Sequence, residues 1–110
     1  MSLRTYTLTL TGAAQRLSDV YGGAPGVADP VTDITYRSLY LQGLLANTNP
    51  IYVGMDATVT SSNHGIRIGS ADTDHPTAIE PSSPGSPLHL SDFYVIGTAN
   101  EVLCVAGIPL

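Results

Sequence analysis

The chain has 110 residues, and its nine acidic and four basic side chains give a formal net charge of −5. The basic residues are all arginines, at positions 4, 16, 37 and 67, and they are spread along the chain. Binding to nucleic-acid phosphates or to anionic membranes needs clustered Lys and Arg, so the composition argues against both partners. Charged residues make up only 12% of the chain, and twelve Thr and ten Ser supply much of its polarity. A surface so poor in charge is typical of proteins that stay in contact with neighbouring subunits.

The length predicts a single domain over residues 1–110. No run of about 20 continuous apolar residues is present, so we expect no transmembrane helix. Residues 5–11 carry Thr at every second position, unlike the apolar segment of a signal peptide. Cys104 is the only cysteine and cannot form an internal disulfide; its apolar surroundings in the sequence predict a buried, unreactive thiol.

The N-terminal third begins with a strong strand pattern. In residues 3–11, Tyr6, Leu8 and Leu10 fall on one face and threonines on the other, which predicts a half-buried strand. Residues 17–21 are a second, shorter strand candidate, and residues 22–30 form a Gly- and Pro-containing loop.

The middle of the chain holds several short strand candidates. Residues 33–42 are rich in strand formers, and strict alternation places Tyr36 and Tyr40 on one face and Leu39 and Leu41 on the other. A helix over residues 39–46 is the alternative, although Gly43 and the following Asn and Pro interrupt it. Residues 51–54, 57–60 and 66–68 are further strands, with a hairpin loop at residues 61–65.

The segment from residue 72 to residue 87 is predicted to be a Pro- and Ser-rich loop or arm, in which only residues 77–80 resemble a strand. Polyproline geometry is extended at little entropic cost, which suits an arm that lies across a neighbouring subunit. The apolar runs 93–97 and 102–106 flank a four-residue turn and predict an antiparallel hairpin. About six to eight short strands predict an all-β, single-domain antiparallel β-sandwich or jelly roll.

One five-residue pattern occurs twice, as Leu17-Ser18-Asp19-Val20-Tyr21 and as Leu90-Ser91-Asp92-Phe93-Tyr94. Five residues are too few to indicate a repeat. We interpret the pattern as a local Ser/Asp turn that the chain uses twice.

Sites of chemistry are not evident in the sequence. His64, His75 and His89 lack the close spacing of zinc ligands, and Asp72 and Asp74 lack the glycine and the late acidic residue of a calcium loop. Neither a nucleophile elbow nor a phosphate-binding loop is present. We therefore predict that the protein is not an enzyme and has no catalytic residues, cofactor or metal. The six tyrosines favour core packing, with an aromatic platform for sugars as the alternative.

Four segments in the second half of the chain form a recognisable series of strands and turns. They are Asn49-Pro50-Ile51-Tyr52-Val53-Gly54, Val59-Thr60-Ser61-Ser62, Gly65-Ile66-Arg67-Ile68 and Leu88-His89-Leu90-Ser91-Asp92-Phe93-Tyr94-Val95-Ile96-Gly97-Thr98. In these segments the chain resembles small virion proteins of tailed bacteriophages. The resemblance implies a β-sandwich or jelly-roll subunit that decorates or cements the head shell, or that forms a small part of a tail or fibre. It also implies synthesis in the host cytoplasm and a final place in the virion, on the capsid surface.

The leading hypothesis is accordingly a capsid decoration protein whose partners are the major capsid protein and copies of itself, as a dimer or trimer. A tail or head-fibre component and a carbohydrate- or receptor-binding β-sandwich module are the alternatives. The N-terminal strand is a candidate for pairing with a partner's sheet, although it could equally lie within its own sheet. Composition alone nominates as partner contacts Arg4 and Tyr6 on this strand and, in the Pro-rich segment, Pro76, Pro81, Pro84 and Pro87.

Overall fold

The computed structural model describes residues 4–21, 35–44, 47–69, 77–80 and 87–109. These ranges hold nine strands and two short 3₁₀ helices, and no helix in them is long and apolar enough to span a membrane. The strands are β1 Arg4–Thr9, β2 Gln15–Arg16, β3 Thr35–Gly43, β4 Ile51–Gly54, β5 Ile66–Ile68, β6 Thr77–Ile79, β7 Leu88–His89, β8 Tyr94–Ile96 and β9 Val102–Pro109. The 3₁₀ helices are η1 Leu17–Tyr21 and η2 Leu90–Asp92.

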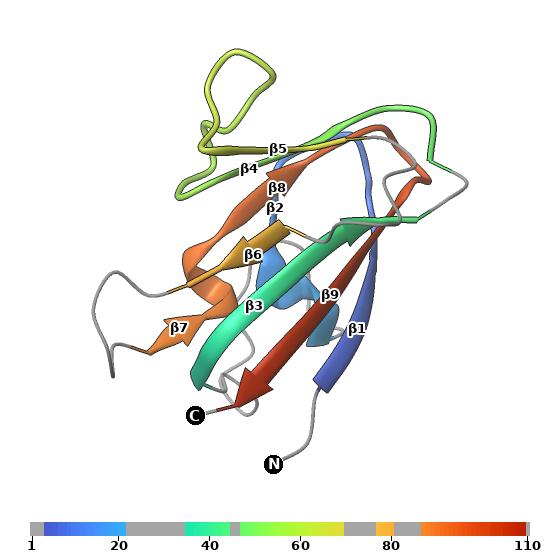
Figure 1. The fold of residues 1–110 in the computed structure, drawn as a ribbon. Coiled ribbons are helices and arrows are strands. Elements are labelled where there is room, and N and C mark those ends of the chain that lie inside the picture. The colour runs from blue at the N-terminus through green and yellow to red at the C-terminus, as the bar shows by residue number, and fades with distance from the viewer. Residues whose placement is uncertain (1–3, 22–34, 45–46, 70–76, 81–86, 110) are drawn as a thin grey trace.

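The strands form two antiparallel sheets (Figure 1). Sheet A has the order β1-β9-β3-β6, with β7 also paired to β3, and sheet B has the order β2-β8-β4-β5. Apart from β7, the pairing is nested: β1 pairs with β9, β2 with β8, β3 with β6 and β4 with β5. A long hairpin wound over itself into two sheets is a jelly roll, so the predicted fold class is confirmed.

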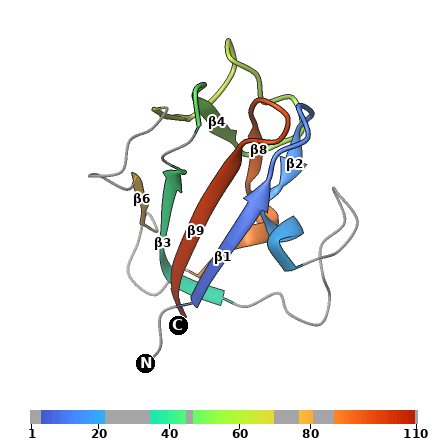
Figure 2. The same ribbon diagram turned by 90° about the vertical axis from the view of Figure 1, so that its right-hand side faces the viewer.

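The core lies between the two sheets and is built by alternation. In β1 and the residue that follows it, Leu8 and Leu10 are buried and the threonines at positions 5, 7 and 9 are exposed, as the sequence predicts. Sheet A contributes Leu39, Leu41, Leu103 and Val105, and sheet B contributes Ile51, Val53, Ile68 and Val95. Figure 2 shows β1, β9 and β3 side by side, with β8 and β2 behind them.

An irregularity in β3 changes which side chains are buried. The pairing of β3 with β9 shifts between Tyr36 and Ser38, so the strand holds one extra residue at Arg37, whose side chain is exposed. Because one extra residue reverses the alternation, Tyr36 joins the core together with Leu39. The prediction that Tyr36 and Tyr40 share a face is therefore wrong, and so is the helical alternative for residues 39–43.

The two C-terminal apolar runs are strands but do not form a hairpin. β8 belongs to sheet B and β9 to sheet A, so the chain crosses the core between them. The connecting turn is fixed to the end of β1, because the Asn100 N–H donates to the Leu10 carbonyl and the Leu10 N–H donates to the Glu101 carbonyl, both at 2.8 Å. The prediction fails because both strands contribute apolar side chains to the core, Val95 from β8 and Leu103 and Val105 from β9. Two such strands bury more surface on opposite sides of one core than as neighbours in one sheet.

Two other short strand predictions are wrong. Residues 17–21 form η1, and residues 57–60 lie in a turn in which only Thr60 makes an isolated bridge, to Asn63. The repeated pattern does correspond to repeated local structure, since both copies start with a 3₁₀ helix and a fully buried leucine, Leu17 or Leu90. The two copies also meet, because the Leu17 N–H donates to the Phe93 carbonyl at 2.8 Å.

The start of β9 is fastened to the segment before β4 by two side chains. The Asn47 amide donates to the Val102 carbonyl at 2.7 Å and accepts from the Val102 N–H at 3.1 Å. The Glu101 carboxylate accepts the backbone N–H groups of Thr48, at 2.7 Å, and Asn49, at 3.1 Å. The Thr48 N–H is the largest of the interactions that lower the pKa of Glu101 below its ordinary value, and partial desolvation opposes them.

This carboxylate predicts a pH-dependent contribution to stability. Because the pKa of Glu101 is lower in the folded chain than in the unfolded chain, ionisation favours folding, and the gain disappears as the pH falls through the folded value. We expect Glu101→Gln to lower the urea midpoint at neutral pH, with a difference from the wild type that shrinks between about pH 5 and about pH 3. The matched control is Glu80→Gln, at an exposed residue after β6 that has no hydrogen bond to the described residues. An equal effect of both variants at every pH would contradict the assignment.

A second prediction concerns the close approach of β9 and β3. A Cβ atom at Gly107 would lie 2.5 Å and 2.6 Å from two ring carbons of Tyr36, which is fully buried and cannot move aside. Gly107→Ala should therefore lower the free energy of unfolding by about 1–3 kcal/mol. Gly65→Ala, where the nearest atom would be 3.7 Å away, should have little effect. Chemical denaturation of both variants measures the difference. Equal stabilities would show that the Tyr36 ring shifts to make room for the added methyl group.

Candidate functional site

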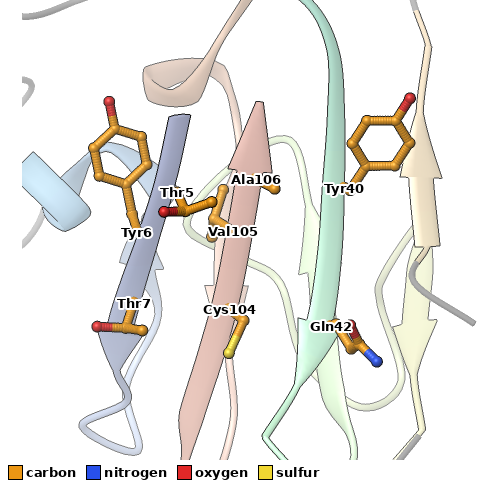
Figure 3. Close-up of a pocket in the computed structure, with 8 residues that line it drawn as sticks. All are labelled: Thr5, Tyr6, Thr7, Tyr40, Gln42, Cys104, Val105 and Ala106. Carbon is orange, nitrogen blue, oxygen red and sulfur yellow. The ribbon is translucent and has the colours of Figure 1, made fainter. Parts of the chain in front are cut away.

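The outer face of sheet A carries a regular array of uncharged side chains. Thr5 on β1 is opposite Ala106 on β9, which is opposite Tyr40 on β3. In the next row Thr7, Cys104 and Gln42 are opposite one another in the same way, and Figure 3 shows this row across the three strands. Beyond it, the Leu44 N–H donates to the Val102 carbonyl at 3.2 Å and continues the β3–β9 pairing, with the Leu44 side chain 42% exposed.

Side-chain size hollows this face into a groove of about 610 Å³. The small side chains of Cys104 and Ala106 lie on the central strand, and the larger Tyr40 and Gln42 rise on one side of them. No charged side chain occurs in the parts of the three strands that form this face, which are residues 5–9 of β1, 38–43 of β3 and 102–109 of β9. We name this surface, with its members Thr5, Thr7, Tyr40, Gln42, Cys104 and Ala106, the sheet A groove.

Cys104 is half-buried and lies on this groove, so the prediction of a buried thiol is wrong. The apolar run of β9 supplies the core only through Leu103 and Val105, and the register turns Cys104 to the other face. The sequence reasoning missed the groove because both faces of β9 are apolar. The small size of residues 104 and 106, which alternate with the larger buried Leu103 and Val105, was the available signal.

The outer face of sheet B differs in charge. The Arg16 Nε donates to the Tyr94 hydroxyl at 2.7 Å, and its guanidinium carbon lies 5.5 Å from the centre of the Tyr94 ring. Tyr52 on β4 is opposite Arg67 on β5, and the His64 ring packs at a tilt on Tyr52 with 4.7 Å between ring centres. Arginine and tyrosine side chains thus lie together on this face, whereas no charged side chain lines the sheet A groove.

The predicted contact residues are scattered. Arg4 is exposed at the start of β1, whereas Tyr6 is half-buried, with its hydroxyl 3.1 Å from that of the buried Tyr36. Pro87 is exposed just before β7. Pro76, Pro81 and Pro84 lie outside the described residues.

The β1 strand and the Pro-rich segment both contribute to sheet A. β1 pairs with β9 along its whole length, so the N-terminal strand lies within its own sheet, as the alternative predicts. It is the end strand in the order β1-β9-β3-β6. Thr77–Ile79 pairs with β3 as β6, so the centre of the predicted arm is a strand at the edge of sheet A. The flanking residues 72–76 and 81–86 lie outside the described ranges.

The candidate metal ligands are also separated. His64 is exposed, with Nδ1 3.1 Å from the Thr60 carbonyl oxygen, and His89 lies on β7. In the ranges that the structure describes, no three His, Cys, Asp or Glu side chains gather in a way that could hold a metal ion. His75, Asp72 and Asp74 lie outside those ranges.

Comparison with protein-family models, with curated proteins and with solved structures finds no match for this chain. Function is therefore inferred from the fold and from the chemistry of the two outer faces.

The position of Cys104 predicts its reactivity. Because its side chain faces the groove rather than the core, Cys104 should react with a small thiol reagent in the native protein, and denaturant should raise the rate by less than roughly tenfold. The control is the double variant Cys104→Ala/Val105→Cys, which moves the thiol one position along β9 to the core face. That thiol should react only after unfolding. Equal protection of both thiols, measured by mass spectrometry over time, would show that the groove is closed.

Proposed function

We propose that this chain is a structural virion protein of a tailed bacteriophage, a capsid decoration (cement) protein that binds the major capsid protein. The proposal starts from the expected resemblance of the second half of the chain to small virion proteins. At the level of the fold it is supported by the jelly-roll topology, which is common in viral capsid domains. Since one fold serves many functions, the observation that carries the proposal is the sheet A groove, which no charged side chain lines.

The energetics of this face favour a protein partner. A charged side chain that is buried at an interface must lose its hydration, at a cost of several kcal/mol unless it is paired. The sheet A groove holds no such group, and its threonine and glutamine side chains can satisfy hydrogen bonds in either water or an interface. Small residues along the floor leave room for a protruding side chain of the partner.

A shell offers the same contact many times over. In a symmetric particle each subunit contact can be modest, because linked copies raise the effective concentration of one another. We also propose that the chain sits on the shell as a dimer or trimer. A tail or head-fibre component would use the same contacts in far fewer copies per particle.

The direct test places a charge in the groove. Thr7→Lys adds an ammonium group to the exposed outer face of β1, and it should weaken binding to expanded capsid shells at least about tenfold, because that charge would be desolvated. Ser62→Lys, in an exposed loop remote in sequence from sheet A, is the matched control and should bind as the wild type does. Cosedimentation with shells measures both affinities, and Cys104 should lose its thiol reactivity on binding.

The number of copies per virion separates the two structural alternatives. Quantitative mass spectrometry should find this chain in fixed proportion to the major capsid protein, and particles that lack it should break at a lower temperature. A few copies per particle would identify a fibre component. If Thr7→Lys binds as well as the control and Cys104 stays reactive on the shell, this face is not the contact.

A further inference from the structure

A second groove, of about 500 Å³, lies on the other sheet, at the end where β4 begins and β8 finishes. Tyr52 and Ile96 are cross-strand neighbours in this sheet and form its apolar wall. Its other side chains include Asn49, Thr60, Ser61 and Thr98. The volume is within the usual range for small-molecule sites, about 300–1,000 Å³, and the mixture of an aromatic ring with a few polar groups is also typical of them.

The loop between β4 and β5 is held in place beside Tyr52. The Thr60 N–H donates to the Asn63 carbonyl at 2.8 Å, and the Asn63 N–H donates to the Thr60 carbonyl at 3.1 Å. The same loop places the His64 ring against Tyr52. These contacts fix Thr60 and Ser61 at the groove before any ligand arrives, which reduces the entropy that binding must cost.

Several polar groups of the groove have no other role in the fold. Among the residues that the structure describes, the hydroxyls of Tyr52, Ser61 and Thr98 have no intramolecular hydrogen-bond partner. Asn49 donates through Nδ2 to Thr48 Oγ1 at 3.1 Å, which leaves its side-chain carbonyl to accept. The groove thus presents donors and acceptors around an aromatic ring, and no charged side chain lines it.

We propose that this groove binds a neutral pyranose saccharide. A pyranose has an apolar C–H face that packs on an aromatic ring and a rim of hydroxyls that both donate and accept hydrogen bonds. Tyr52 supplies the ring, while Ser61, Thr98 and Asn49 supply the partners for the rim. A phosphorylated or acidic sugar is disfavoured because no cation lines the groove; Arg67 lies beside Tyr52 on β5 but outside the lining.

The groove and the proposed shell contact are on different sheets, so the two can be occupied together. A subunit that covers the sheet A groove on a shell would leave the outer face of sheet B available for glycans. The saccharide site does not depend on the proposed function, since it can be tested on the isolated protein.

The experiment uses the isolated full-length chain on an array of neutral and acidic glycans, followed by titration calorimetry with the neutral oligosaccharide that gives the strongest signal. We expect saturable binding of neutral glycans, reduced at least tenfold by Tyr52→Ala. Tyr52→Phe keeps the ring and should lose less affinity. Tyr40→Ala removes the matched tyrosine from the outer face of sheet A and should bind as the wild type does.

Two further measurements keep the test decisive if Tyr52→Ala unfolds. Thr98→Lys places a long side chain in the groove from an exposed turn, and it should abolish binding while the thermal unfolding curve stays unchanged. Amide chemical-shift changes on titration should centre on residues 49–52, 60–61 and 96–98. Absence of saturable binding, preference for acidic glycans, or shifts centred on the sheet A groove would each overturn the proposal.

Discussion

The register of β9 is the constraint on which both the core and the candidate contact surface depend. β9 lies between β1 and β3 and pairs with both along most of its length. Its register turns Leu103 and Val105 into the core and presents Cys104 and Ala106 on the outer face. A slip of one residue would exchange the two sets. The close fit of Gly107 against the Tyr36 ring opposes such a slip, because only a residue without a side chain fits there.

The sequence predicted the strands with clear alternation better than it predicted the connections between them. Leu8 and Leu10 alternate with threonines, and successive side chains of a strand point to opposite faces, so their burial could be predicted directly. The route from β8 to β9 could not be predicted, because a four-residue turn between apolar runs serves equally for a hairpin and for a crossing between sheets. Tertiary contacts decide, here the hydrogen bonds of Leu10 with Asn100 and Glu101. The extra residue at Arg37 was equally hidden, since a bulge depends on the partner strand.

The candidate site was only partly accessible to sequence reasoning for a related reason. The low proportion of charged residues indicated a surface suited to contact with neighbouring subunits, and the threonines of β1 indicated one part of that surface. The central part, Cys104 and Ala106, lies in a run that is apolar on both faces, and such a run is typical of a strand covered on both sides. In the part of the chain that the structure describes, sheet B covers only the inner face of β9, and Cys104 and Ala106 lie on the opposite face, in the sheet A groove.

A contact through the uncharged sheet A groove would also link the stability of this chain to its binding. A partner that binds only the folded state stabilises it by mass action, to a degree set by concentration and affinity. If the partner is a shell, the coupling is reciprocal, because the same free energy of contact that holds the subunit folded also holds the neighbouring capsid subunits in place. A small domain with a modest core gains most from such an arrangement. The uncharged lining of the sheet A groove and the arginine–tyrosine pairs on sheet B would then give the subunit a fixed orientation, with sheet A toward the shell and sheet B toward solvent.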